Sequence, residues 1–179
     1  IKKKIEYDDS IDGSHSFWDI LVIYTAAAET SEGSNSAMET LIATAISETN
    51  TGYINSDIDA RVFLVETYKT SYTEDNSTGE IASKALSHIG SDSTISGVKS
   101  DYAADATILI YAETGSSLCG LGNLMQTTSG AFTTGNSVCR TSCCTGYYSF
   151  GHELGHNIGL CHDAPITSTS GDCLYTYSH

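Results

Sequence analysis

Residues 152–163 read His-Glu-Leu-Gly-His-Asn-Ile-Gly-Leu-Cys-His-Asp, a run that holds three histidines and one glutamate at short intervals. His152 and His156 are separated by about one turn of an α-helix, so both side chains would project from the same helix face. A single small cation needs two ligands placed in this way, and neutral imidazole suits zinc at about 2.0–2.1 Å. The spacing therefore predicts that His152 and His156 bind one zinc ion.

Glu153 directly follows the first of these histidines. On a helix its side chain points about 100° away from that of His152. It can therefore reach a water molecule on the metal without being a ligand, and its carboxylate can accept a proton from that water. We expect Glu153 to be the catalytic general base.

His162 poses a geometric problem for the same site. On a continued helix it would lie about 240° around the axis from His156 and roughly 9 Å further along, out of reach of the metal. The helix must therefore end between the two residues. Gly159 is suited to that end, because glycine adopts the left-handed conformation at little steric cost. We expect the chain to turn back at Gly159 and to present His162 as the third zinc ligand.

The extended pattern H-E-x-x-H-x-x-G-x-x-H resembles the active site of the metzincin metallopeptidases. Asp163, after the third histidine, is the residue seen in the reprolysin (adamalysin-like) branch and in the related bacterial peptidyl-Asp metallopeptidases. Residues 21–25 (LVIYT), 49–50 (TN) and 119–120 (CG) also resemble these groups. The resemblance implies a zinc-dependent endopeptidase that hydrolyses extended protein or peptide substrates with metal-activated water.

Three short, apolar, β-branched runs predict buried strands, and helical spacing of apolar residues predicts the helices. The expected strands are 18–25, 60–67 and 106–111, and the expected helices are 34–48, 78–89 and 147–159. Ser34 or Ser36 would cap the first helix, and Asn50-Thr51-Gly52 would end it. The alternation of strands and helices predicts an α/β (α+β) fold with a mostly parallel sheet.

The metzincin resemblance makes this fold more specific. It implies a zincin-like, mixed, mostly parallel five-stranded sheet, two large helices, the metal helix and an antiparallel edge strand that lines the cleft. Residues 17–179 would form the catalytic domain, with an upper subdomain to about residue 159 and a smaller lower subdomain after it. The polar residues 1–16 are expected to form an N-terminal arm. Metzincins carry a methionine turn after the third histidine, whereas Met38 and Met125 both precede it, so we expect an incomplete lower subdomain.

Two short, glycine-rich runs lie between the third strand and the metal helix. Residues 120–126 (GLGNLMQ) and 131–138 (AFTTGNSV) predict a hairpin or edge strands near the rim of the sheet. The resemblance implies that Gly120, Leu121, Gly122 and Asn123 bind extended substrate by strand addition. Asp163 is expected to orient a metal ligand or the loop backbone through a hydrogen bond.

The chain is strongly acidic, since 22 Asp and Glu against 8 Lys and Arg give a formal net charge of −14. Nucleic acid and anionic membrane surfaces require clustered bases, so neither is expected as a partner. Calcium would suit an acidic chain, but no D-x-D-x-D-G loop supports it. We expect a monomer whose partner is a protein or peptide substrate.

Six cysteines are crowded into one part of the chain, at positions 119, 139, 143, 144, 161 and 173. An even number in this arrangement predicts three disulfides and an oxidising compartment, so we expect a secreted protein. Sequence alone does not choose among the pairings, although the adjacent Cys143 and Cys144 should have different partners. The sequon Asn76-Ser77-Thr78 agrees with secretion.

Other functions fit the same residues less well. A non-catalytic, zinc-stabilised binding or adhesion module could keep the motif, but a structural zinc site has no need of Glu153 and usually has a fourth protein ligand. Cys161 could bind zinc as a thiolate, although a disulfide suits an oxidising compartment better. A small-molecule zinc hydrolase would have a deep, closed pocket. No G-x-S-x-G motif supports a serine hydrolase.

Overall fold

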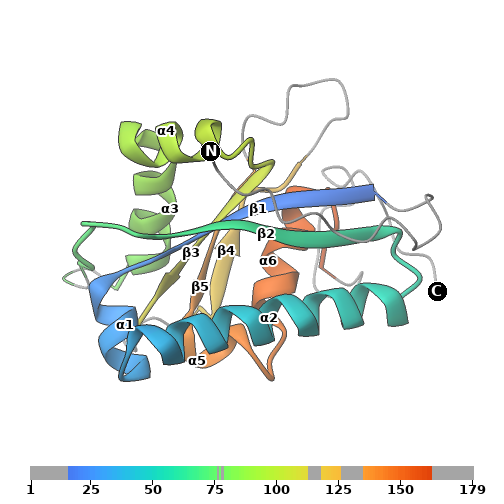
Figure 1. Cartoon of the computed structure of the whole chain (residues 1–179), viewed down its shortest axis with the longest axis horizontal. Helices are drawn as coiled ribbons and strands as arrows, with labels where there is room; N and C mark the ends of the chain where they lie inside the picture. The colour runs from blue at the N-terminus through green and yellow to red at the C-terminus, as the bar shows by residue number, and fades with distance from the viewer. Residues whose placement is uncertain (1–15, 76, 78, 113–117, 126–134, 163–179) are drawn as a thin grey trace.

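Five strands form one mixed sheet in the computed structural model, which describes residues 16–75, 77, 79–112, 118–125 and 135–162 (Figure 1). The strands are β1 (Ser16–Tyr24), β2 (Ala60–Lys69), β3 (Ala106–Tyr111), β4 (Gly120–Gly122) and β5 (Asn136–Arg140). Their order in the sheet is β2-β1-β3-β5-β4. The pairs β1–β2, β1–β3 and β3–β5 are parallel, and the edge strand β4 is antiparallel to β5. The expected mostly parallel, five-stranded sheet with an antiparallel edge strand is confirmed.

The helices occupy the connections between strands. They are α1 (Ala26–Glu32), α2 (Asn35–Asn55), α3 (Ile81–Ser91), α4 (Ser93–Asp101), α5 (Thr141–Cys144) and α6 (Ser149–Asn157). The expected cap of the long helix is confirmed, because the Ser34 hydroxyl accepts a hydrogen bond from the Ala37 N–H at 3.1 Å. Asp92 caps α4 in the same way, through the N–H groups of Thr94 and Ile95. Each cap satisfies donors that would otherwise be unpaired in the first turn.

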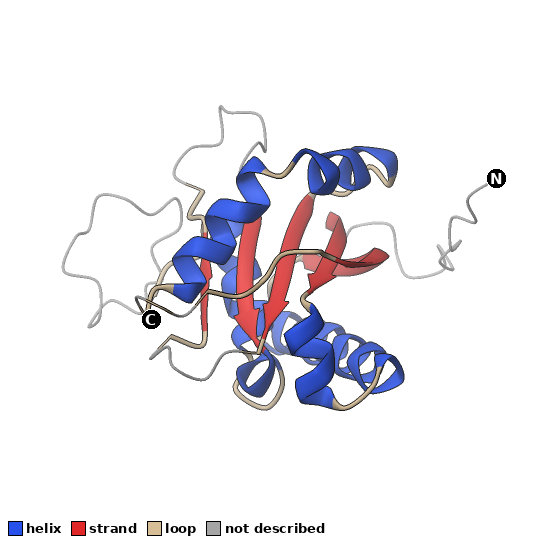
Figure 2. Ribbon diagram, turned by 90° about the vertical axis from the view of Figure 1, so that its left-hand side faces the viewer, coloured by secondary structure: helices blue, strands red, loops and turns tan. Residues whose placement is uncertain are grey.

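Two apolar cores lie on opposite faces of the sheet, because successive side chains of a strand point to opposite faces. The first core contains Ile20, Val22, Ile108 and Ile110 together with residues of α1, α2 and α6. The second core contains Leu21, Ile23, Leu109 and Tyr111 together with residues of α3 and α4. Figure 2 shows the sheet between these two helical layers. Strands covered on both faces are apolar along their length, which explains why every residue of β3 is buried.

The long helix α2 continues to Asn55, so the prediction that Asn50-Thr51-Gly52 would end it was wrong. The Asn50 side chain is used outside the helix. Its amide donates to the Val62 carbonyl at 3.0 Å, and its carbonyl oxygen accepts from the Val62 N–H at 2.8 Å. Tyr53, in the last turn of the helix, is buried in the first apolar core. Tertiary contacts thus outweigh the low helix propensity of this tripeptide.

The region between β2 and β3 holds two helices where one was expected. α3 begins at Ile81, a little later than the expected start at Thr78, and α4 follows after Asp92. The second helix buries little apolar surface, with Ile95 as its buried residue. A helix of this kind leaves almost no periodic pattern in the sequence.

The two glycine-rich runs contribute two antiparallel strands near the rim of the sheet, as expected, although of these two only β4 is an edge strand, because β5 pairs with both β3 and β4. β4 occupies the start of the first run, and β5 covers the end of the second and continues to Arg140. Gly120 pairs with Cys139 and Gly122 pairs with Ser137. Residues 126–134 lie outside the described residues.

Several expectations fall on residues that are not described. The N-terminal arm lies there except for Ser16, as do Asn76 and Thr78 of the sequon and residues 163–179. The division into upper and lower subdomains therefore stays a prediction. Among the described residues, no helix is both long and apolar enough to cross a membrane.

The described cysteines are in two chemical states. Cys119 and Cys143 form a disulfide, and Cys161 is also disulfide-bonded. Cys139 and Cys144 are both buried and are not bonded in this structure, which therefore does not confirm a third disulfide.

Candidate metal centre

The helix α6 carries the first two histidines of the motif and begins with a sharp turn of the chain. Tyr148, just before it, has a left-handed backbone with φ 58°. The Tyr148 carbonyl accepts the hydrogen bond of the His152 N–H at 3.0 Å. The side of α6 that faces the sheet is buried, including Phe150 and Leu154. The helix is thereby fixed to the core while His152 keeps exposed surface.

The helix α6 ends between His156 and His162, as a third ligand at His162 requires. Its last residue is Asn157, and Gly159 has the left-handed φ of 88°. The Gly159 N–H donates to the His156 carbonyl, and the Leu160 N–H donates to the Gly155 carbonyl, both at 3.0 Å. These bonds close the helix C-terminus and reverse the chain. The predicted end of the helix between His156 and His162 is confirmed.

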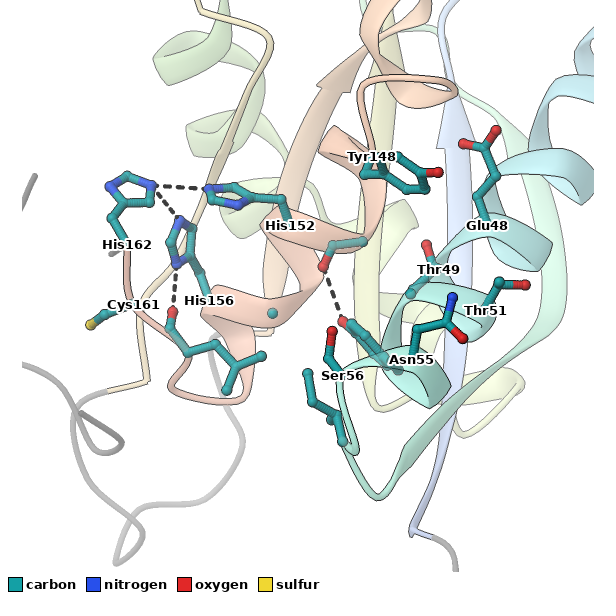
Figure 3. Close-up of a pocket in the computed structure, with 16 residues that line it drawn as sticks. Glu48, Thr49, Thr51, Asn55, Ser56, Tyr148, His152, His156, Cys161 and His162 are labelled. Carbon is teal, nitrogen blue, oxygen red and sulfur yellow. Dashed lines mark hydrogen bonds between the residues drawn. The ribbon is translucent and has the colours of Figure 1, made fainter. Parts of the chain in front are cut away.

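The three histidine rings converge on one point (Figure 3). The Nε2 atom of His162 lies 3.0 Å from Nε2 of His152 and 3.1 Å from Nε2 of His156. Three nitrogens bound to one tetrahedral zinc ion at about 2.05 Å would be about 3.3 Å apart. This cluster is the one group of at least three potential metal ligands found among the described residues. The donor set therefore fits one zinc ion.

The imidazoles of His152 and His156 are held in a form that can bind a metal. Burial, and then the neighbouring His156 and His162, lower the pKa of His152 to about 4. Burial also lowers the pKa of His156. The His156 Nδ1 lies 2.7 Å from the Leu160 carbonyl oxygen, which can accept only if Nδ1 carries the proton. Nε2 is then free to bind a metal, in the arrangement usual for histidine ligands.

The Glu153 side chain projects from the metal helix α6 toward the edge strand β4. Its side chain is only 6% exposed, and burial raises its pKa to about 7. A Cβ atom at Gly120 would lie 2.6 Å from both Cγ and Oε1 of Glu153. The absence of a side chain at Gly120 therefore makes room for the carboxylate. A carboxyl group that titrates near neutral pH can both take up and release a proton.

The edge strand crosses α6 at very short range. A Cβ atom at Gly122 would lie 2.5 Å from the Glu153 carbonyl oxygen and 3.2 Å from the His156 Cβ. Asn123 follows directly, and its N–H donates to the Asn136 carbonyl at 3.0 Å. The structure thus brings Gly120, Gly122 and Asn123 beside the histidine cluster. Asp163 lies outside the described residues.

A match to a family model decides the relationship of this chain to known proteins. The model is that of a reprolysin group described as metallo-peptidase family M12, and it matches residues 14–179. The chain belongs to metallopeptidase family M12. The resemblance inferred from the histidine motif is confirmed by this match.

Curated relatives support the same placement of this M12 chain. It is 35% identical over 162 residues to a peptidyl-Asp metalloendopeptidase of Stenotrophomonas maltophilia, covering 89% of the chain and 36% of that protein. It is 33% identical over 161 residues to one of Xanthomonas campestris, covering 89% of the chain and 37% of that protein. The chain thus spans little more than a third of the length of these relatives.

A solved structure shares the fold of the M12 chain. It is a chain in the structure of a chaperone–substrate complex, with a TM-score of 0.67 and 20% sequence identity. The alignment covers 84% of the M12 chain and 24% of that chain. At this identity the likeness shows the fold alone.

A cleft of about 910 Å³ in the M12 chain reaches the histidine cluster. Residues of α2, among them Glu48 and Thr49, line one side, and residues of α6 line the other. Figure 3 shows the three histidines at one end of this cleft and Glu48 and Tyr148 at the other. The residues that line it include neither Glu153 nor any residue of β4, so it is not the cleft that the edge strand was expected to line.

Contacts that the motif does not reveal hold the metal helix of the M12 chain in place. The Tyr53 hydroxyl donates to the Gly151 carbonyl at 3.0 Å, and a Cβ at Gly151 would lie 2.8 Å from Thr49 Oγ1. The buried Asn157 side chain bonds the carbonyls of Asn123 and Asn136 at 2.8 and 3.1 Å. Of these residues, only Thr49 was indicated by the sequence, through a resemblance; Tyr53 and Asn157 were not predicted to have a role. A buried polar residue that bonds distant backbone carries no local sequence signal.

Cys161 separates the second and third histidines along the chain but is not a candidate ligand. It is disulfide-bonded, which removes the thiolate that zinc would need. Of the two roles weighed from the sequence for this cysteine, the structure supports the disulfide.

Proposed function

We propose that this chain is the catalytic part of a zinc-dependent endopeptidase, with His152, His156 and His162 as the metal ligands and Glu153 as the general base. The convergence of three imidazoles carries this proposal: the Nε2 atom of His162 lies 3.0 Å from that of His152 and 3.1 Å from that of His156. Membership of the M12 family supports it. The buried carboxyl at Glu153 distinguishes the site from a purely structural zinc site, which would need no base.

A bound zinc ion would supply an activated water molecule and polarise the scissile carbonyl group. The three histidines would hold the ion by Nε2, and the Leu160 carbonyl would keep the proton of His156 on Nδ1. Glu153 would accept a proton from the attacking water on a carboxylate oxygen and then deliver it to the leaving nitrogen. In the metal-free protein, burial raises the pKa of Glu153 to about 7, which supports a carboxyl group that can both take up and release a proton.

The edge strand would position the substrate. β4 is the last strand in the sheet order of the described residues, so its outer edge can pair with an extended peptide. Gly120, Leu121, Gly122 and Asn123 would bind the peptide main chain beside Glu153 and the histidines. The names of the relatives make a peptide bond next to an aspartate the first cleavage site to test.

Other features of the proposal concern the whole protein. The Cys119–Cys143 disulfide supports secretion into an oxidising compartment. The formal net charge of −14 supports the absence of nucleic acid among its partners. We also propose a monomer, and a hydrogen-bonding role for Asp163 beside the third ligand.

Casein digestion by the full-length protein tests the function. The expected result is digestion that 1,10-phenanthroline abolishes and that added zinc restores. Glu153→Gln should keep its zinc and lose hydrolysis by a factor of at least about 100. A Glu153→Gln variant that cleaves casein at the parent rate would refute the role of Glu153, and activity that survives complete removal of metal would refute the whole proposal.

A further inference from the structure

Two buried thiols face each other where β5 turns into α5. Cys139 lies on β5 with no exposed surface, and Cys144 is the last residue of α5 with 1% exposed surface. Their Sγ atoms are 2.8 Å apart. Both side chains belong to the core that also contains Phe150 and Leu154 of the metal helix.

This distance is too short for two sulfur atoms that are not bonded. Non-bonded carbon atoms pack at about 3.5–4.0 Å, and sulfur is the larger atom. Two thiolates on one tetrahedral zinc ion, at about 2.3 Å each, would be about 3.8 Å apart. A covalent bond of about 2.05 Å is the arrangement that requires the smallest movement from the observed positions.

The neighbouring cysteine Cys143 is not available as a partner for Cys139 or Cys144. Cys143, adjacent to Cys144, is already bonded to Cys119. Cys139 and Cys144 also belong to no group of three or more metal-binding side chains among the described residues. Burial first, and then Cys144 and the Glu153 carboxylate, raise the pKa of the Cys139 thiol. A thiolate that binds a metal or attacks a substrate is therefore disfavoured at this position.

We propose that Cys139 and Cys144 form a disulfide in the mature protein. The bond forms by thiol–disulfide exchange with a small disulfide such as oxidised glutathione. One cysteine sulfur attacks the glutathione disulfide and releases one reduced glutathione. The second cysteine then attacks the mixed disulfide and releases another. Two protein thiols are oxidised and one glutathione disulfide is reduced to two thiols, which take up the two protons.

Because both sulfur atoms are buried in the folded protein, the exchange must take place before folding is complete. Neither sulfur is accessible once α5 and α6 cover β5, so the oxidant must reach them during folding. After folding, the same burial protects the bond from reductants.

The proposed bond reinforces the corner that leads into the metal centre. It joins the strand β5 to the end of α5, and α6 begins only a short segment later, at Ser149. On the other side, Cys139 pairs with Gly120, which lies against Glu153. The Cys119–Cys143 disulfide already links the start of β4 to α5. Together the two bonds would tie the edge strand, β5 and the approach to α6 into one unit.

Peptide mapping without reduction tests the proposal and does not depend on peptidase activity. The protein is purified under oxidising conditions, denatured, alkylated with iodoacetamide, and digested with trypsin and Glu-C. The expected fragments 114–140 and 141–153 then contain Cys119 with Cys139, and Cys143 with Cys144, respectively. The proposal predicts that these fragments remain joined and carry no alkyl group. A joined species with two alkyl groups, on Cys139 and Cys144, would overturn it.

A variant identifies the partners. In Cys119→Ala/Cys143→Ala, each of the two fragments keeps one cysteine, and the proposal predicts that they still remain joined. Separate, alkylated fragments from folded protein would overturn the pairing. Should this variant fail to fold, the mapping of the parent protein decides alone.

Single variants provide the matched control. Cys144→Ala should expose Cys139 to alkylation in denaturant, and Cys139→Ala should do the same for Cys144. Each should also melt several degrees lower than the parent under non-reducing conditions, because the crosslink is lost. Melting temperatures unchanged from the parent would contradict a stabilising bond.

Discussion

The side-chain amide of Asn157 donates a hydrogen bond to the main-chain carbonyl of Asn123 at 2.8 Å, joining the end of the metal helix to the end of the edge strand. The same amide nitrogen lies 3.1 Å from the Asn136 carbonyl on β5. A second link runs in parallel, since the Met125 N–H donates to the His156 carbonyl at 3.0 Å. These hydrogen bonds therefore fix the position of the edge strand relative to the metal helix that carries His152 and His156.

Replacing Asn157 with Asp should disturb this link specifically. A carboxylate at the same place removes both hydrogen bonds and faces two carbonyl oxygens, at a cost of about 1–3 kcal/mol for unsatisfied buried groups. We expect KM for a peptide substrate to rise about tenfold or more while the zinc content stays at one ion per chain. Asn157→Leu has similar volume and no charge. It therefore shows the effect of losing the amide donor without the repulsion between a carboxylate and the two carbonyl oxygens. A purely structural role would lower the melting temperature of both variants and leave KM unchanged.

Removing the third histidine should weaken metal binding. With Nε2 of His162 absent, His152 and His156 provide only two protein ligands. We expect His162→Ala to lose zinc on dialysis against a weak chelator that leaves the parent loaded. His88→Ala, whose side chain lies on α3 in the layer on the opposite face of the sheet, is the matched control and should retain zinc. Equal zinc content in His162→Ala and the parent would remove His162 from the ligand set.

The buried carboxyl of Glu153 should make the metal-free protein less stable as the pH rises. Its pKa is raised from 4.5 to about 7, so the folded state binds this proton more tightly than the unfolded state does. The stabilising contribution is complete below the unfolded pKa and is lost as the pH rises through the folded pKa. At pH 8 the charged group costs about 3 kcal/mol, which Glu153→Gln would remove. Urea unfolding of metal-free protein should show the variant more stable than the parent at pH 8 and similar to it at pH 4. If the difference in the free energy of unfolding between variant and parent were the same at pH 8 and pH 4, the raised pKa of Glu153 would not be its cause.

The contact between α2 and α6 leaves no space for a side chain at Gly151. A Cβ there would lie 2.8 Å from Oγ1 and 3.0 Å from Cγ2 of Thr49. We expect Gly151→Ala to lower stability by about 1–3 kcal/mol, because overpacking forces the two helices apart. Gly52→Ala is the matched control: its Cβ would meet nothing within 4 Å, and alanine favours the helix by about 0.5–1 kcal/mol. Thermal unfolding of both variants should show shifts of opposite sign.

Gly120→Ala should impair both folding and catalysis. Its methyl group would lie 2.6 Å from the Glu153 carboxylate oxygen Oε1 and 2.7 Å from the Val138 carbonyl oxygen. We expect kcat to fall about tenfold or more with zinc still bound, since the displaced carboxylate no longer reaches its proton. Hydrolysis of a fluorogenic peptide at saturating substrate measures this, and kcat equal to that of the parent would show that Glu153 tolerates the methyl group.

The parts of the site that depend on local spacing could be predicted from the sequence. The positions of His152 and His156 on one helix face, and the reversal at Gly159 that returns His162, follow from helix geometry and from the conformational freedom of glycine. The strands β1 and β3 could also be predicted, because parallel strands buried on both faces are apolar along their length.

The parts that depend on distant partners could not be predicted in the same way. The end of α2 was misplaced because Asn50 bonds the backbone of β2 and Tyr53 bonds Gly151, and neither partner is near in sequence. The role of Asn157 has the same character. The helix α4 was missed because a helix that buries little apolar surface leaves little periodicity.

The glycines at positions 120 and 122 bring the backbone of β4 close against α6: Gly120 lies against the Glu153 side chain, and Gly122 lies against the Glu153 main chain. Elsewhere in a core, a substitution by a slightly larger or smaller residue moves two elements apart or together by fractions of an ångström. At this junction no smaller residue exists, and any larger one collides with Glu153 or with the main chain beside it. The separation between β4 and α6 is therefore set by the backbone of the two glycines, by the main chain of α6 and by the Glu153 side chain. Substitutions elsewhere on the strand or the helix can change other contacts while the separation between these two elements stays constant.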